Sequence, residues 1–204
     1  MTENGIEDIY PLTALQQGFL WHWLAGTEAG LGIEQIGLVL QGPLRLEAYA
    51  TVDEANAQLG VALATGGLDG DVVAVLTRVQ NDLFDVGADL CTPVVPDPEF
   101  PPLRIEQDYV DRLEQWCDEY NEHLPRLRSF ILNGGTPAAA HLHVARVVIR
   151  RAERAGWRAH EQYADTMNVL ALTYLNRLSD LVFILARHAN RDRGDVLWVP
   201  GGER

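Results

Sequence analysis

Hydrophobic and small residues recur at intervals of three and four positions through most of the chain after residue 46. This spacing places them on one face of an α-helix, whereas a half-buried strand would alternate at every second position. The pattern is interrupted by turn-forming residues, and the uninterrupted stretches predict five helices. The expected helices cover residues 47–65, 71–90, 105–124, 138–160 and 166–190.

The breaks between these helices contain residues that end or begin helices. Two glycines at 66–67 follow the first helix, and residues 91–103 hold five prolines, which cannot continue a helix because proline lacks a backbone N–H. Before the fourth helix, Thr136 is suited to cap the helix and Pro137 to occupy its first position. Short turns without an alternating strand pattern predict an all-α five-helix bundle over residues 47–204.

Residues 1–46 have a different pattern. They mix a helix-like stretch with a glycine-containing, β-branched one, so we expect a short irregular N-terminal extension to the bundle. The predicted organisation is therefore an N-terminal segment of residues 1–46 followed by a helical domain of residues 47–204.

Composition narrows the classes of function. The 204 residues carry a formal net charge of −13 and include no lysine, and this acidity argues against nucleic acid as a partner. We find no secretory signal and no apolar run of the roughly 18 to 20 residues that span a membrane. Cys91 and Cys117 lie outside any CxxC, so neither a disulfide framework nor a zinc ribbon is predicted. A cytoplasmic protein with no membrane partner is expected.

Five of the sixteen basic residues fall between Arg146 and Arg158. On a helical projection they form two stripes beside the expected core face. The first stripe holds Arg146, Arg150, Glu153 and Trp157, the second holds Arg151, Arg154 and Arg158, and the core face holds Val144, Val148, Ala152 and Ala155. One interpretation is a solvated charged face. The other is an anion site, since the planar guanidinium suits phosphate oxygens and stays charged when half-buried.

The last helix carries a polar pair that needs partners. Asn176 and Asp180 lie one turn apart in an otherwise apolar helix, and Phe183 continues the same stripe. A buried carboxylate without a partner is strongly destabilising. The arginine stripe of the preceding helix is the candidate partner.

Several motifs occur in an order and spacing typical of one family. They are "TVDEANAQLG", "RVQNDLFDVGADL", "RSFILNGGTPAAAHLHVAR", "IRRAER" and "YLNRLSDLVFILAR". Together they resemble the ATP:cob(I)alamin adenosyltransferases of the PduO type over residues 45–204. The resemblance implies a homotrimer with active sites between subunits, and it implies ATP with Mg²⁺ and cobalamin as ligands. In the implied reaction, cob(I)alamin attacks the 5′ carbon of ATP and triphosphate leaves.

The same resemblance implies roles for single residues. The residues implied at the nucleotide are Arg150, Arg151, Glu153, Asn176 and Asp180. Asp53 and Arg146 match an interface salt bridge that shapes the active site. Phe130 matches the aromatic residue that crowds the lower face of the corrinoid, removes its lower axial ligand and makes Co(II) easier to reduce. Fixed guanidinium groups would stabilise the charge that develops on the leaving triphosphate.

The sequence departs from the family pattern in two places. The family's N-terminal phosphate loop, T-R-x-G-D-x-G-x-T with a following lysine-bearing segment, is missing in recognisable form; residues 25–32 carry no cation but do carry Glu28. Asn133 replaces the proline of the family's "FILPGGT". Residues 6–47 instead resemble the opening segment of a nonribosomal peptide synthetase condensation domain, without that family's HHxxxDG motif.

Three functions stay open at this point. The first is ATP-dependent adenosylation of a corrinoid. The second is a repurposed bundle that no longer uses ATP and binds or converts another ligand in a natural-product pathway, with a peptidyl carrier protein as a partner. The third is a non-catalytic corrinoid-binding protein. The missing loop weighs against the first, because each charged hydrogen bond lost removes roughly 1.5 to 3 kcal/mol of phosphate binding.

Other ionisable residues are interpreted as structural. His141 and His143 face different sides of one helix, so they do not predict a metal site. Asp85, Asp89 and Asp165 are expected to cap helices or to lie on the surface.

Overall fold

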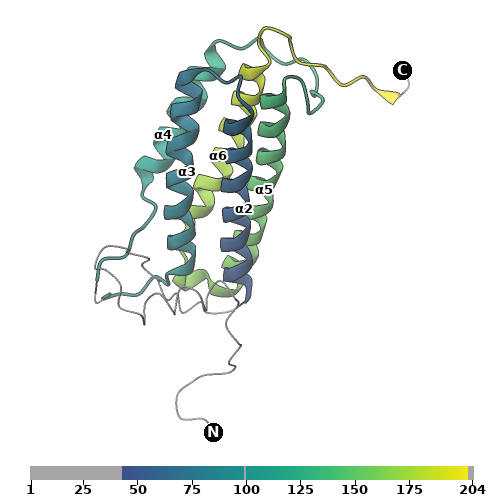
Figure 1. The fold of residues 1–204 in the computed structure, drawn as a ribbon. Coiled ribbons are helices and arrows are strands. Elements are labelled where there is room, and N and C mark those ends of the chain that lie inside the picture. The colour runs from purple at the N-terminus through teal and green to yellow at the C-terminus, as the bar shows by residue number, and fades with distance from the viewer. Residues whose placement is uncertain (1–42, 99, 202–204) are drawn as a thin grey trace, which may run out of the picture. The chain divides into compact units, whose positions relative to one another are not determined.

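The protein has an all-α fold, as predicted (Figure 1), in a computed structural model that describes residues 43–98 and 100–201. The chain divides into two units, residues 1–37 and 38–204, and the described residues belong to the second. Its helices are α2 (Pro43–Thr65), α3 (Gly70–Cys91), α4 (Gln107–Glu122), α5 (Pro137–Tyr163) and α6 (Val169–Ala189), with a 3₁₀ turn, η1 (Ala164–Thr166), before the last.

The N-terminal predictions lie almost entirely outside the described residues. These are the irregular extension, the condensation-domain resemblance and the loss of the phosphate loop. α2 begins at Pro43, ahead of the predicted start at residue 47. The proposed division at residue 46 stays a prediction.

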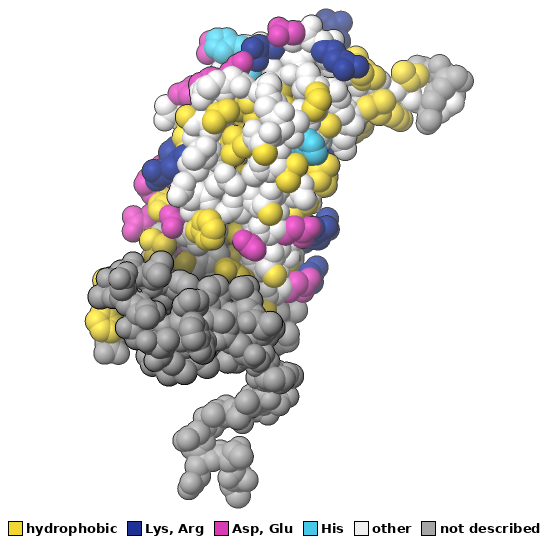
Figure 2. Space-filling view, viewed as in Figure 1, with side chains coloured by type: hydrophobic (Ala, Val, Ile, Leu, Met, Phe, Trp, Pro, Cys, Tyr) yellow, Lys and Arg dark blue, Asp and Glu magenta, His cyan; other side chains and the backbone are white. Residues whose placement is uncertain are grey.

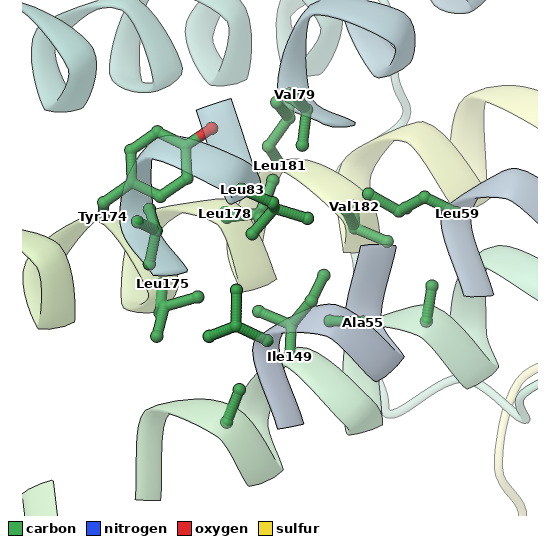
Figure 3. Close-up of a cluster of buried hydrophobic side chains, with 14 of the residues drawn as sticks. Ala55, Leu59, Val79, Leu83, Ile149, Tyr174, Leu175, Leu178, Leu181 and Val182 are labelled. Carbon is green, nitrogen blue, oxygen red and sulfur yellow. The ribbon is translucent and has the colours of Figure 1, made fainter. Parts of the chain in front are cut away.

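The helices pack side by side around one hydrophobic core (Figure 1). α2 packs against α3 and α5, and α6 packs against α5 and α4. Figure 3 shows part of the core, to which α2, α3, α5 and α6 all contribute. Its members include Ala55, Leu59, Val79, Leu83, Ile149, Leu175, Leu178 and Val182.

Part of the buried face of α5 is built from small residues. These are Ala145, Ala152, Ala155, Gly156 and Ala159. A Cβ atom on Gly156 would overlap Leu172 Cδ2 of α6, so the Leu172 side chain would have to shift if another residue replaced this glycine. The predicted core face was wrong at Val144, which is exposed, because the buried face runs through Ala145 instead.

The ends of α5 and α6 follow from local side-chain chemistry. The Thr136 hydroxyl accepts a hydrogen bond from the Ala139 N–H (3.1 Å), and Pro137 occupies the first turn, which confirms both predictions. α6 begins at Val169, later than the predicted residue 166. The reason is that Asn168 caps it by accepting from the Leu170 N–H (3.1 Å).

α6 is the one described helix that is long and apolar enough to cross a membrane by length and composition, a property that sequence inspection missed. Its apolar side chains form the centre of the bundle core, including Leu172, Leu175, Leu178, Val182 and Leu185. We therefore interpret α6 as the core helix of the bundle.

Asp89 is a buried anchor, so its assignment to a cap or the surface was wrong. Its side chain is fully buried and pairs with Arg104 (2.5 Å). It also accepts hydrogen bonds from the Ile105 N–H (2.7 Å) and from Asn168 Nδ2 (2.7 Å). One carboxylate thus joins the end of α3, the proline-rich connection and the cap of α6, which are far apart in the sequence.

Asp82 on α3 is the centre of a second buried network. Only 1 % of its side chain is exposed, and it pairs with Arg78 (2.9 Å) and Arg112 (3.0 Å). The Tyr174 hydroxyl donates to the same carboxylate (3.1 Å). Burial first, and the Asp82 charge second, raise the pKa of Tyr174 well above its usual value, which keeps this donor protonated. The network ties α3, α4 and α6 together.

We predict that Asp82→Asn lowers the free energy of unfolding by about 3 kcal/mol, because it leaves two arginines and a buried tyrosine without their shared charge. Urea denaturation at pH 7 measures the effect. Asp108→Asn is the control, since Asp108 is 69 % exposed and its only pair is at 3.9 Å; it should change stability by no more than about 0.5 kcal/mol. Equal effects of the two substitutions would contradict the assignment of Asp82 as the anchor.

Candidate functional site

A cavity of about 310 Å³ lies between α5, α6 and the connection from α4 to α5. α5 contributes two arginines to its lining, α6 contributes two polar residues and an aromatic residue, and the connection supplies the opposite wall. The lining residues are Leu127, Ser129, Phe130, Ile131, Asn133, Arg146, Arg150, Ser179, Asp180 and Phe183. Four predicted site residues therefore line one cavity, namely Phe130, Arg146, Arg150 and Asp180.

Arg146 and Arg150 give the cavity a positive wall. They lie one turn apart on α5, and Arg146 is half-buried with its guanidinium 5.5 Å from the centre of the Phe183 ring. Arg146 Nη2 donates to Asn133 Oδ1 (3.4 Å), while its Nε is buried with no partner among the described residues. Burial first, and the neighbouring Arg150 second, lower the pKa of Arg146. Two adjacent cations facing the single carboxylate Asp180 favour an anionic ligand.

Phe130 lies at the rim of the cavity with 78 % of its surface exposed. Its ring meets the Trp198 ring edge-on at 6.1 Å between centroids. The backbone around it pairs with the C-terminal segment, since Ile131 and Leu197 form an antiparallel bridge. An exposed aromatic ring beside an anion site can pack against a flat ligand.

Asn176 and Glu153 meet beside this cavity. Asn176 Nδ2 donates to Glu153 Oε1 (2.8 Å), and Arg177 Nη2 donates to Asn176 Oδ1 (2.6 Å). Arg177 also pairs with Asp180 (3.3 Å). The first stripe of α5 therefore faces the polar pair of α6, as predicted. The charge partner of Asp180, however, comes from its own helix.

The remaining predicted residues point elsewhere within the described chain. Arg151 pairs with Glu54 of α2, and Arg158 pairs with Glu47, all four side chains being about half exposed. The solvated-face interpretation therefore describes the second stripe. Asp53 is exposed and forms no ion pair among the described residues. A role for Arg151 or Asp53 at a ligand stays a prediction.

Sequence reasoning missed the wall of the cavity that follows α4. Leu127, Ser129 and Ile131 have no periodic pattern, because the connection is not helical. Their position depends on contacts with the C-terminal segment, which lies beyond the last predicted helix. The one available signal was the tryptophan in that segment, Trp198.

Comparisons with known proteins agree with this geometry. The sequence profile of the family described as cobalamin adenosyltransferase matches residues 35–189. A corrinoid adenosyltransferase from Mycobacterium tuberculosis is 56% identical over 179 residues, covering 88% of this chain and 92% of the relative. One from Bacillus subtilis is 40% identical over 156 residues, covering 74% and 77%.

A solved structure supports the same relationship. It is a variant PduO-type ATP:corrinoid adenosyltransferase from Lactobacillus reuteri in complex with cobalamin and ATP, with a TM-score of 0.70 and 34% sequence identity. The match covers 78% of this chain and 88% of that one. These comparisons confirm the family resemblance. They do not support the predicted resemblance of residues 6–47 to a peptide-synthetase condensation domain.

His143 packs against Phe183, which lines the cavity, and its protonation can be used to test the packing around the site. It is buried, its ring centroid is 6.3 Å from that of Phe183, and neither ring nitrogen has a partner among the described residues. Burial first, and Arg146 second, lower the pKa of His143 from 6.5, while Asp195 opposes the shift. The folded state therefore favours the neutral ring.

We predict that the free energy of unfolding falls as the pH drops below about 6.5, because the unfolded chain then binds a proton at His143 that the folded chain resists. Above that pH the ring is neutral in both states, and the effect vanishes. Denaturation from pH 8 to pH 5 should show a shallower decline for His143→Leu than for the wild type. Parallel curves for the two proteins would contradict this account.

Proposed function

Because the chain belongs to the cobalamin adenosyltransferase family, we propose that it transfers the 5′-deoxyadenosyl group of ATP to cob(I)alamin and releases triphosphate. The observation that carries the proposal is that two arginines, Arg146 and Arg150, line the same cavity as Phe130. The cavity joins a wall suited to phosphates and an aromatic rim suited to a flat macrocycle.

The chemistry of the transfer explains the positive wall. An electron pair of Co(I) forms the cobalt–carbon bond to C5′, and the electrons of the breaking C5′–O bond leave with the triphosphate. Negative charge therefore grows on the bridging oxygen in the transition state. Guanidinium groups placed beside that oxygen would stabilise the transition-state charge more than they stabilise bound ATP, which would lower the barrier.

The other site residues have supporting roles in this proposal. Glu153 and Asn176, hydrogen-bonded to each other, would contact the nucleoside, and Asp180 with Arg177 would fix the edge of the phosphate site. Phe130 would pack under the corrinoid, exclude the lower axial ligand and so ease reduction of Co(II). The family resemblance implies only that Glu153, Asn176 and Asp180 lie at the nucleotide and that Phe130 lies at the corrinoid. The nucleoside contact and the part given to Arg177 are proposed from the placement of these residues in and beside one cavity.

Mg²⁺ fits this site only as a companion of ATP. Among the described residues, no group of three or more His, Cys, Asp or Glu side chains gathers to hold a metal. Mg²⁺ commonly binds through one or two carboxylates together with substrate phosphates. Asp180 is the carboxylate that lines the cavity, so it is the side chain that would hold the ion.

The alternative functions are outcomes of the same test. Purified protein is mixed with Mg-ATP and cobalamin under reducing conditions, and the visible spectrum is followed. Formation of adenosylcobalamin supports the proposal. Corrinoid binding without ATP binding would favour a corrinoid-binding protein, and binding of neither would favour a repurposed bundle that serves a natural-product pathway or a peptidyl carrier.

We expect Arg150→Ala to weaken ATP and inorganic triphosphate binding by about 10- to 100-fold, which corresponds to the loss of one charged hydrogen bond. Isothermal titration measures both ligands. Arg154→Ala is the matched control, because Arg154 is an exposed arginine on the same helix that does not line the cavity. Equal affinities of the two variants would place the phosphate site elsewhere.

We further propose that the protein is a homotrimer with sites between subunits, in which Asp53 of one copy pairs with Arg146 of the next. Asp53 is exposed without an ion pair, and Arg146 Nε lacks a partner, within the described part of one chain. Figure 2 shows hydrophobic side chains spread over the face that α2 and its neighbours present. Exposed apolar residues on α2, α3 and α5 include Val61, Val73, Phe84, Val144 and Val147.

A charge exchange tests this arrangement. Asp53→Arg should dissociate the trimer by bringing two cations together, and the double variant Asp53→Arg with Arg146→Asp should restore it. Light scattering after size-exclusion chromatography measures the mass. A wild type that is monomeric at micromolar concentration, or a single variant that remains trimeric, would contradict the proposed pair.

A further inference from the structure

We propose that Arg187 is a positioning residue for Phe130 and acts on the corrinoid side of the site. It does not line the cavity, and no motif quoted for the family resemblance assigns it a role at the site. The proposal rests on the proposed function in one respect, that Phe130 contacts the corrinoid.

Arg187 is a buried cation near the C-terminal end of α6. Its side chain is 4 % exposed, and it pairs with Asp195, which is 11 % exposed (Nε to Oδ2, 2.9 Å). Its Nη2 donates to the Pro125 carbonyl (2.6 Å). A charge this deeply buried is retained only where its partners are well placed. One guanidinium therefore joins α6 to two separate segments.

Those two segments flank the wall that carries Phe130. Pro125 begins the connection that supplies Leu127, Ser129 and Phe130 to the cavity. Asp195 begins the C-terminal segment that pairs with the same connection. In that pairing the Leu132 N–H donates to the Val196 carbonyl (2.8 Å), and the Trp198 N–H donates to the Phe130 carbonyl (2.8 Å).

The side chains continue this pairing around Phe130. The Ser129 hydroxyl donates to the Trp198 carbonyl (3.2 Å), and the Trp198 ring meets the Phe130 ring edge-on. Phe130 is otherwise held weakly, because it is exposed and outside any helix, and among the described residues its segment is joined to the C-terminal segment by two backbone hydrogen bonds, one on each side of a single bridge. An isolated bridge of this kind is unstable without an anchor. Arg187 is the buried group that holds Pro125 and Asp195, on the N-terminal side of Phe130 and of Trp198, while Asn190 holds the far end of the connection at Gly134.

This arrangement divides the cavity into two independently supported sides. Arg150 stands on α5, whose position depends on helix packing and not on Arg187. Phe130 depends on Arg187 through Pro125 and Asp195. Loss of the Arg187–Asp195 pair should therefore weaken the productive binding of the corrinoid and leave phosphate binding unchanged.

The test uses the full chain with Arg187→Met, which keeps the volume of the side chain, and Asp195→Asn, which keeps its shape. Hydrogen exchange read by mass spectrometry should show faster exchange at the Leu132 and Trp198 amides, by about 10-fold or more. The KM for cob(I)alamin should rise by about 10-fold, since small displacements of a positioning group have effects of this size or larger. The affinity for inorganic triphosphate should change by less than about twofold.

The spectrum of cob(II)alamin bound together with Mg-ATP is a second measurement. It would stay unchanged if Arg187 only stabilised the fold. The fraction that has lost its lower axial ligand should fall in both variants. Asp82→Asn is the matched control, because it breaks a different buried ion pair in the same bundle. It should destabilise the protein without changing the exchange of the Leu132 and Trp198 amides or the cob(II)alamin spectrum.

The outcomes separate the two proposals. Unchanged exchange at Leu132 and Trp198, or faster exchange with unchanged corrinoid KM and spectrum, would overturn the role of Arg187. The same changes in Asp82→Asn would also overturn it, since they would reflect stability alone. If the wild type forms no adenosylcobalamin, the proposed function fails. The exchange rates alone then decide whether Arg187 fixes the Phe130 segment.

Discussion

The close contact between α5 and α6 determines where the other parts of the site lie. Gly156 on α5 lies against the Leu172 side chain of α6, which would have to shift if a larger residue replaced this glycine. With α5 and α6 packed together, the helical repeat determines which of their side chains face each other. Arg146 and Arg150 lie beside Asp180 and Phe183, and one turn further along, Glu153 meets Asn176. The cavity forms where the helices stop touching and the non-helical connection covers the gap.

The sequence was sufficient for features that depend on local spacing. Five helices, the Thr136 cap and the facing of Glu153 toward Asn176 all follow from interactions within one helix or from one helical projection. The projection was less reliable at the level of a single position, because one residue corresponds to about 100° of rotation. Val144 was assigned to the core on that basis, although the buried face is centred on Ala145.

Features that depend on distant segments could not be found in this way. Asp89 reads as a surface charge because its partners, Arg104 and Asn168, belong to other elements. The wall of the cavity likewise exists through contacts between the connection after α4 and the C-terminal segment. A family resemblance supplied the identity of Phe130, but nothing in the local sequence indicated that Arg187 supports it.

The positive charge of the cavity is carried by guanidinium groups, and the chain contains no lysine. A guanidinium stays protonated across the whole range in which proteins stay folded, and acetylation does not target it. The electrostatic attraction of this site for an anion is therefore permanent. Control over turnover, if the cell exerts it here, has to operate through shape and assembly, by moving the aromatic wall or separating neighbouring copies.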